Sequence, residues 1–217
     1  MKLSKRLEAC VNYTDGFLNL ADIGTDHAQL PIAAIKRGYV SKAQAIDNKH
    51  GPYVMAFSNV KRNELTDKID VILGDGINKI SPETDVVVIS GMGGELIAKI
   101  LLNDSTQNVK RFVLQPNNHA SKIREILPQL RYKIVDEIVL EDQYKIYEVI
   151  VIEPGNQDLS DEQIEYGPFN LTYKPHFFIK KINQEIIQLE YILTQLNDLE
   201  KIEKVNTKLS RVKEFLK

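Results

Sequence analysis

The sequence of 217 residues has a single cysteine, Cys10, and lacks internal repeats and low-complexity tracts. One cysteine cannot form an intramolecular disulfide, so nothing indicates an oxidising compartment. The charged N-terminus MKLSKRLEAC has no apolar signal-peptide core, and no stretch reaches the roughly 18 apolar residues of a membrane-spanning helix. We therefore expect a soluble, cytoplasmic protein without a membrane partner.

The sequence also lacks the common metal and nucleotide motifs. Its four histidines, His27, His50, His119 and His176, are scattered, and no zinc-ligand spacing is present. We expect no metal. Neither the phosphate-binding motif G-x-x-x-x-G-K-[ST] nor the dinucleotide motif G-x-G-x-x-G occurs, which excludes a phosphate-binding loop of that type and argues against NAD.

Charge gives weak guidance about partners. The net charge of −2 argues against a general nucleic-acid coat protein. Residues 1–65 nevertheless carry nine Lys and Arg against six acidic residues. A local basic patch in this third of the chain can still bind phosphate.

Apolar runs of strand length alternate with helix-length segments between residues 18 and 154, which is typical of βα units around a parallel sheet. Two further runs, 133–142 and 145–154, are separated by Gln143 and Tyr144 alone, so they should be antiparallel neighbours. This pattern favours an α/β, Rossmann-like Class I methyltransferase sheet, mostly parallel with an antiparallel last strand, over a dehydrogenase. The five runs that precede the pair are 18–22, 43–47, 69–75, 85–91 and 111–116.

The last part of the chain shows helical periodicity instead. Two apolar series follow the three-and-four spacing of a coiled coil and flank the turn-like segment 197–201. We expect a C-terminal antiparallel helical hairpin, with a catalytic domain at 1–160 and the hairpin at 161–217. The two series are Ile182, Ile186, Leu189, Leu193 and Leu196, then Leu199, Ile202, Val205, Leu209, Val212 and Leu216.

Ligands of such sheets bind at the carboxyl ends of the strands. The turns expected there read DIGTDH, DNKHGP, GDG and SGMGG. Gly24 lets the first turn pass close under a cofactor, and Asp47, 25 residues after Asp22, is placed to accept hydrogen bonds from a ribose diol. The alternative is that Asp47 caps the following helix, and both roles can coexist.

The third and fourth turns offer further candidates. Asp75, between Gly74 and Gly76, can accept a hydrogen bond from the exocyclic amine of an adenine, although Asp-Gly is also an ordinary turn dipeptide. The segment from Ser90 to Gly94 holds three glycines in four residues, as expected where bare backbone lines a reacting group. A plain flexible loop is the alternative.

Several strings together resemble one family. LSKRL, ADIGTDHAQLPI, GDG, ISGMGGELIAKIL, LQPN and YEVIV occur in the order found in bacterial tRNA adenine(22)-N1-methyltransferases, from residue 3 to about 152. The first turn departs from the general Class I pattern, with Asp26 and Ala28 where glycines are common, and in this it resembles the family's own version. The resemblance implies S-adenosylmethionine as cofactor, methyl transfer to N1 of adenine 22 in tRNA, and a helical appendage that helps to hold the RNA.

On this interpretation the first turn serves two ligands. Asp26 is the candidate that accepts a hydrogen bond from the exocyclic amine of the target adenine. His27 is the candidate that orients this carboxylate, or that contacts the flipped base or the carboxylate of the cofactor. The alternative is that Asp26 caps the helix starting near Ala28. The predicted cofactor-binding residues are Asp22, Gly24, Asp47, Asn48, Asp75, Gly76, Gly91, Met92 and Gly93.

The predicted RNA contacts are basic residues and one amide. Each basic residue is equally compatible with a solvated surface charge, Asn117 with a turn, and Arg6 with a contact to the cofactor carboxylate. The predicted contacts are Lys2, Lys5, Arg6, Lys36, Arg37, Lys61, Arg62 and Asn117.

Two other functions stay open: methylation of another base or a small molecule, and RNA binding without turnover. The chain is expected to be a monomer.

Overall fold

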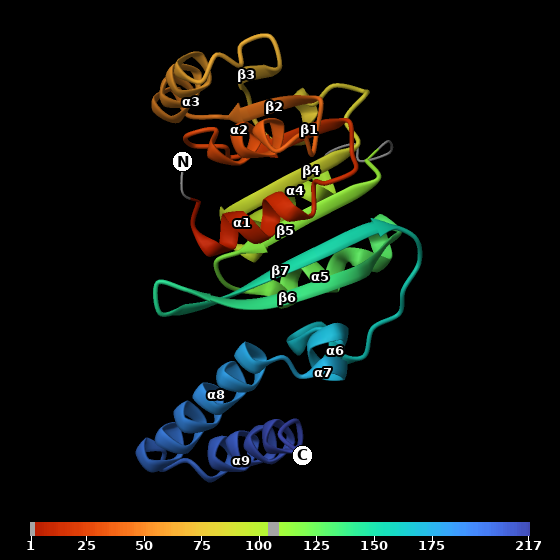
Figure 1. Ribbon diagram of the computed structural model, residues 1–217. Helices are drawn as coiled ribbons and strands as arrows, with labels where there is room; N and C mark the ends of the chain where they lie inside the picture. The colour runs from red at the N-terminus through yellow and green to blue at the C-terminus, as the bar shows by residue number, and fades with distance from the viewer. Residues whose placement is uncertain (1–2, 104–108) are drawn as a thin grey trace. The chain divides into compact units, whose positions relative to one another are not determined.

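The computed structural model describes residues 3–103 and 109–217, so the prediction for Lys2 lies outside the described residues. The chain divides into two compact units between Gly167 and Pro168. The first unit holds the sheet and its covering helices, and the second holds a pair of long helices (Figure 1). No helix in the described part of the chain is long and apolar enough to cross a membrane.

The first unit is built on one seven-stranded sheet with the order β3-β2-β1-β4-β5-β7-β6. Strands β1 to β5 pair in parallel, while β7 is antiparallel to both β5 and β6. The predicted fold class, a mostly parallel α/β sheet closed by an antiparallel hairpin, is confirmed. The strands are β1 (Asn19–Ile23), β2 (Lys42–Asp47), β3 (Ile69–Leu73), β4 (Val86–Met92), β5 (Arg111–Pro116), β6 (Tyr132–Asp142) and β7 (Lys145–Pro154).

The strands are continuous apolar runs because helices cover both faces of the sheet. Val86 to Ile89 of β4 are fully buried, with none of their surface exposed. Helices α1, α2 and α3 pack on one face, and α4 and α5 lie together on the other (Figure 1). The helices of this unit are α1 (Lys5–Asn12), α2 (Gln29–Lys36), α3 (His50–Arg62), α4 (Gly94–Asn103), α5 (Ala120–Leu130) and α6 (Asp161–Tyr166), with the 3-10 turn η1 (Ile77–Lys79).

The chain builds β1, β2 and β3 outward and then returns to place β4 on the other side of β1. This reversal is the topological switch point of the sheet. Ligands of open α/β sheets bind in the crevice outside the carboxyl ends of the strands at such a point. The fold therefore directs attention to the turns after β1 and β4.

A buried cation ties α5 to the β6–β7 hairpin. Arg124 is fully buried and its guanidinium lies 2.7 Å from a carboxylate oxygen of Glu137, with Glu148 on the same nitrogen. It also donates to the carbonyls of Ile164 and Glu165, near the end of α6. These bonds attach α6 to the sheet unit. The predicted domain boundary, at residue 161, instead placed α6 with the hairpin.

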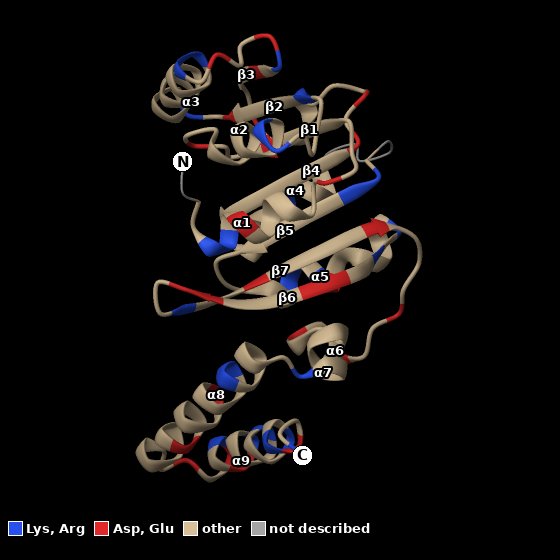
Figure 2. Ribbon diagram, viewed as in Figure 1, with Lys and Arg blue, Asp and Glu red and all other residues tan. Residues whose placement is uncertain are grey.

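The second unit contains α7 (Pro168–Tyr173), α8 (His176–Gln195) and α9 (Leu199–Glu214). The two predicted apolar series form a largely buried seam on α8 and α9. Its buried residues are Ile182, Ile186, Leu189, Leu209 and Val212. The interhelix ion pairs Lys208–Glu185, at 2.9 Å, and Lys213–Glu190, at 2.8 Å, flank it. Both signs of charge are mixed along the two helices (Figure 2).

Two predicted seam positions are wrong. Leu199 is 83% exposed and Leu216 is 38% exposed. Leu199 is the first residue of α9, and Leu216 lies beyond its last residue, Glu214. Positions at or beyond a helix end lack a full turn of neighbouring helix around them, so the apolar spacing extends further along the chain than the burial does.

Candidate active site

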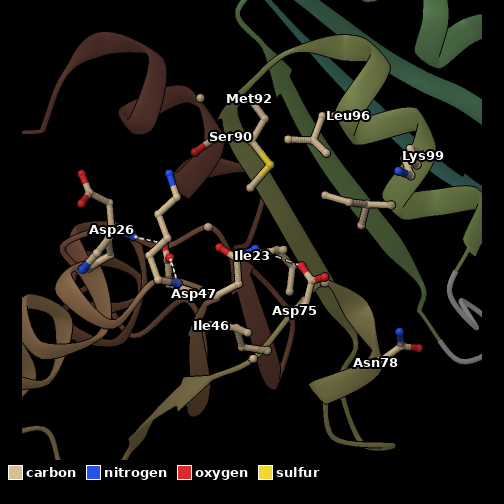
Figure 3. A pocket seen from close by; sticks show the side chains of 18 of the residues that line it. Ile23, Asp26, Ile46, Asp47, Asp75, Asn78, Ser90, Met92, Leu96 and Lys99 are labelled. Atoms are coloured by element: carbon tan, nitrogen blue, oxygen red, sulfur yellow. Dashed lines mark hydrogen bonds between the residues drawn. The ribbon is translucent and has the colours of Figure 1, made fainter.

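A cavity of about 740 Å³ opens at the carboxyl ends of β1 to β4 (Figure 3). This is the position that the switch point indicates. Its walls come from all four turns that the sequence analysis singled out and from one face of α4. The lining residues are Ile23, Gly24, Asp26, Ile46, Asp47, Asn48, Lys49, Pro52, Gly74, Asp75, Gly76, Asn78, Ser90, Gly91, Met92, Leu96, Lys99, Ile100 and Asn103.

The β1 turn is held in an unusual backbone conformation. Gly24 has a φ of +74°, and its N–H donates to the carbonyl of Ile46 at 2.8 Å. Asp26 and Ala28 also have positive φ, at +51° and +54°. Helix α2 begins at Gln29 with Ala28 at its N-cap and no side-chain capping bond. The alternative that Asp26 caps this helix is therefore wrong.

Asp26 and His27 are neighbours at the mouth of the cavity. His27 Nε2 lies 3.4 Å from Asp26 Oδ2, and the two side chains are 42% and 65% exposed. Asp26 lines the cavity, while His27 is not among the lining residues. The pair is thus accessible to a large substrate, with the carboxylate closer to the cavity than the imidazole.

Asp22 lies behind the same turn and is buried, with 3% of its surface exposed. Burial raises the pKa of its carboxyl group to about 7; the hydroxyl of Thr25, which donates to it at 2.6 Å, lowers this pKa, and the neighbouring Asp47 raises it. A carboxyl group with such a pKa is easily converted to the anion by a nearby cation. Asp22 does not itself line the cavity.

Asp47 joins the first two turns. Its Oδ2 accepts from the N–H of Asp26 at 3.4 Å, and its Oδ1 accepts from the N–H of Lys49 at 2.9 Å. The N-cap of α3 is Lys49 and has no side-chain capping bond, so Asp47 is not the cap of that helix. Asp47 lines the cavity at the end of β2, where a ribose diol was predicted.

Asp75 lies across the cavity on the β3 turn. The side-chain amide of Asn48 donates to Asp75 Oδ1 at 3.2 Å, which links the second and third turns. Gly76 has a φ of +62°, a region that L side chains rarely adopt, so glycine suits this position. Three predicted cofactor residues, Asn48, Asp75 and Gly76, therefore meet at one wall.

The β4 turn is shaped by close backbone packing and is not a loose loop. Gly91 has a φ of +78°, and the β4–β5 register shifts between Ser90 and Met92. A Cβ on Gly94 would lie 2.1 Å from the carbonyl oxygen of His119. Gly91 and Met92 line the cavity, whereas Gly93, also predicted to bind cofactor, does not.

The two halves of the cavity meet at one contact. A Cβ built on Gly24 would lie 2.2 Å from the terminal methyl of Met92. The β1 and β4 turns therefore touch through the Met92 side chain, and the bare backbone of Gly24 is what allows it. The sequence predicts a cofactor above Gly24, and the neighbour seen here is a side chain of the protein itself, so that prediction stays open.

The predicted RNA contacts do not gather in one place. In βα units the helices start near the carboxyl ends of the strands and run back towards the amino ends. The residues at the ends of α2 and α3 therefore lie one helix length, about 12 to 20 Å, from the turns. These residues are Lys36, Arg37, Lys61 and Arg62. Arg37 forms an ion pair with Glu8 at 2.7 Å. Lysine and arginine also begin α1 (Figure 2), where Lys5 is exposed.

Arg6 and Asn117 form hydrogen bonds with other residues of the protein, Arg6 to a buried side chain and the exposed Asn117 to the backbone. Arg6 Nη1 donates to the side-chain oxygen of Gln115 at 2.9 Å. The Asn117 side-chain amide donates to the carbonyl of Gly91 at 2.6 Å. Both side chains thus take part in the structure around the β4 turn, which agrees with the turn role left open for Asn117.

The wall formed by α4 is not among the predicted parts of the site. Leu96, Lys99, Ile100 and Asn103 line the cavity and share one helix face. Their spacing of three, four and seven residues is the signal that could have found them, because α4 starts directly at the glycine turn. Lys49 was also missed. Among the described residues, no group of three or more His, Cys, Asp and Glu side chains is placed to hold a metal ion.

Known proteins resemble this chain over its full length. The profile of the TrmK family, tRNA (adenine(22)-N(1))-methyltransferase, matches residues 20–216. A protein of that description from Bacillus subtilis is 38% identical over 221 residues, covering 98% of this chain and 93% of the relative.

Two solved structures with bound ligands are similar throughout. A Streptococcus pneumoniae structure in complex with S-adenosyl-L-methionine is 35% identical, with a TM-score of 0.92 and 100% of both chains covered. M. capricolum TrmK in complex with S-adenosyl-homocysteine is 28% identical, with a TM-score of 0.89 and coverage of 99% of this chain and 98% of that one.

Proposed function

This chain belongs to the tRNA (adenine(22)-N(1))-methyltransferase family, and from that premise we propose that its cavity at the β1–β4 turns transfers a methyl group from S-adenosylmethionine to N1 of adenine 22 in tRNA. The observation that carries the site assignment is the β1 turn. Asp26 has a positive φ, caps no helix and lines the cavity with an exposed carboxylate. Strained residues of this kind cluster at active sites.

The residues of the cavity fit the cofactor. S-adenosylmethionine supplies the methyl group and brings a sulfonium, an ammonium, a ribose diol and an adenine. Asp47 would accept from the ribose diol, and Asp75, held by Asn48, would accept from the adenine amine. Asp22 lies behind the β1 turn as a buried carboxyl with a raised pKa. The sulfonium or ammonium of the cofactor would lower this pKa and favour the carboxylate anion.

The acceptor chemistry needs charge stabilisation more than a base. N1 of adenine carries its lone pair in the ring plane and loses no proton before it reacts, but methylation leaves positive charge on the ring. Asp26 accepts a hydrogen bond from the exocyclic amine and stabilises that charge, a type of preorganised contact that contributes roughly 3–4 kcal/mol. His27, 3.4 Å from Asp26, orients the carboxylate.

The substrate must present an unpaired base. N1 is engaged when adenine is paired, so adenine 22 has to leave its stack to reach Asp26. Folded-RNA shape then provides selectivity, read by surfaces beyond the cavity. The exposed Lys5 at the start of α1 and the C-terminal hairpin are the proposed contacts to tRNA, with Lys36, Arg37, Lys61 and Arg62 as more distant ones. The protein acts as a monomer in the cytoplasm, where tRNA is modified.

The test is methyl transfer to unmodified tRNA. The protein is incubated with S-adenosylmethionine labelled in its methyl group, and the RNA is digested and analysed by nucleoside mass spectrometry. We expect label in N1-methyladenosine, and none when adenine 22 of the transcript is replaced by guanine. Label in another nucleoside contradicts the N1 assignment. No label, with cofactor binding measured separately, favours an RNA-binding protein without turnover.

A further inference from the structure

The buried side-chain amide that accepts from Arg6, that of Gln115, lies behind the β4 turn and does not line the cavity. Gln115, near the end of β5, has none of its surface exposed. Buried polar groups are normally satisfied by hydrogen bonds, so the partners of such a side chain indicate its task. Those of Gln115 lead directly to the cavity wall.

Every polar atom of this side chain is engaged. Gln115 Oε1 accepts from Arg6 Nη1 at 2.9 Å and from the N–H of Gly91 at 3.2 Å. Its Nε2 donates to the carbonyl of Pro116 at 2.8 Å. Because an amide oxygen has two lone pairs and both are used, the amide has one orientation that satisfies all these partners.

The far end of this link is the bulge Ser90–Met92 at the carboxyl end of β4. The N–H of Gly91 is held by Gln115, and its carbonyl accepts from the Asn117 side chain at 2.6 Å. The next carbonyl, that of Met92, accepts from the N–H of Asn117 at 2.7 Å. The end of β5 therefore fixes both polar groups of Gly91 and places Met92, whose methyl lies against Gly24.

Arg6 completes the link from the other side. Its guanidinium lies 5.6 Å from the centroid of the Tyr147 ring, and its backbone N–H donates to Asp142 at 3.3 Å. A Cβ on Gly91 would lie 3.2 Å from Arg6 Nη1. The first turn of α1 thus holds a cation directly behind the cavity wall, directed at the Gln115 oxygen.

We propose that Gln115, with Arg6 as its charged donor, is a positioning residue for methyl transfer: it fixes the bulged turn Ser90–Met92 where the two reactants meet. This inference rests on the proposed function. Displacements of about 1 Å at a reacting site can lower rates about a hundredfold. The proposed carboxylate contacts to the cofactor, Asp47 and Asp75, lie on other turns that Gln115 does not bond. Gly91 and Met92, also predicted to bind cofactor, offer no charged side chain, so cofactor affinity should depend mainly on the carboxylates and only little on this link.

The first experiment separates kcat from binding. We expect Gln115→Leu and Arg6→Ala to lower kcat for tRNA methylation about 10- to 100-fold, while the Kd of S-adenosylhomocysteine, measured by calorimetry, changes less than about threefold. Gln115→Glu keeps both acceptor contacts and loses the donation to Pro116, so it should retain more activity than Gln115→Leu. The matched control is Arg111→Ala, on the same strand at its other end, where the guanidinium binds Glu153 and covers Phe17.

The second experiment needs no activity. The chain has three methionines, so methyl-labelled methionine gives a simple NMR spectrum in which Met92→Leu assigns the signal of Met92. We expect Gln115→Leu and Arg6→Ala to shift or broaden this signal in the folded protein, and Arg111→Ala to leave it in place. An unchanged Met92 signal overturns the positioning role even if activity falls.

The remaining outcomes are distinct. Wild-type kcat in both variants, or a loss of kcat matched by an equal loss of cofactor affinity, overturns the positioning role and leaves the proposed function intact. A wild-type protein that methylates no adenine overturns the proposed function and this inference with it.

Discussion

Asp22, behind the β1 turn, is a buried carboxyl whose ionisation costs stability. Its carboxyl is buried, and burial raises its pKa from 3.8 to about 7. Between these two pH values the folded state holds a proton that the unfolded state has released, so the contribution of Asp22 to stability falls as the pH rises through this window. Above pH 7 the full cost of the buried anion is present.

Asp22→Asn should therefore stabilise the protein in the absence of cofactor. The asparagine keeps an acceptor for Thr25 but cannot ionise. A shift of about three units corresponds to on the order of 4 kcal/mol or less at pH 8, and the gain should shrink towards zero near pH 4. Urea unfolding of both proteins across this range measures it. A gain that is constant with pH would show that the ionisation of Asp22 is not its source.

Some residues of the site could be predicted from the sequence and others could not. Gly24, Asp47 and Asp75 were predictable, because ligand-binding turns of this fold follow known strands. The inward direction of Arg6 was not, since its partner Gln115 is 109 positions away and only the packing of α1 on the sheet brings them together. Lys49 was missed because it follows Asp47 without any periodic pattern.

At the scale of elements, the strands were visible in the sequence because both faces of the sheet are covered, which leaves uninterrupted runs such as that of β4. The antiparallel pairing of β6 and β7 followed from the two-residue link alone. The start of α2 near Ala28 was predictable, whereas its capping was not, since Ala28 lies in the left-handed region and provides no side-chain cap. Burial at the hairpin ends, as at Leu199, depends on where the partner helix stops.

The packing of α4 against the start of α5 allows a test of one glycine, Gly94. A Cβ on Gly94 would lie 2.1 Å from a backbone oxygen that cannot rotate away. Gly94→Ala should therefore lower the free energy of unfolding by about 1–3 kcal/mol. The control is Gly51→Ala in α3, where a Cβ meets nothing within 4 Å and should stabilise the helix by about 0.5–1 kcal/mol. Urea unfolding curves of the two variants should move in opposite directions.

At the scale of the whole molecule, the two units are expected to divide the work. The cavity lies entirely in the first unit, and several lysines of the hairpin pair with its own acids, as Lys208 does with Glu185 and Lys213 with Glu190. The hairpin should therefore contribute to tRNA binding through its shape and a small number of charges, which implies a shallow dependence of affinity on salt.

Removal of the second unit tests this division. A chain ending at Gly167 should bind S-adenosylhomocysteine with a Kd within about threefold of the full chain, because no cavity residue is lost. Its kcat/KM for tRNA should fall at least about tenfold, as expected when about 1.4 kcal/mol or more of binding to the transition-state complex is lost. Circular dichroism establishes that the shortened chain is folded. Undiminished kcat/KM would exclude the hairpin from substrate recognition.

The most direct test of the account is the methylation rate of the Asp26→Ala protein. Asp26 is proposed to contact the methyl acceptor and not the cofactor. Its loss should therefore lower kcat about 100-fold or more, while the Kd of S-adenosylhomocysteine stays within about threefold. Glu64→Ala is the control, because Glu64 is also an exposed acid with positive φ, at +57°, and lies outside the cavity. An Asp26→Ala protein that methylates adenine N1 at the wild-type rate would contradict the account.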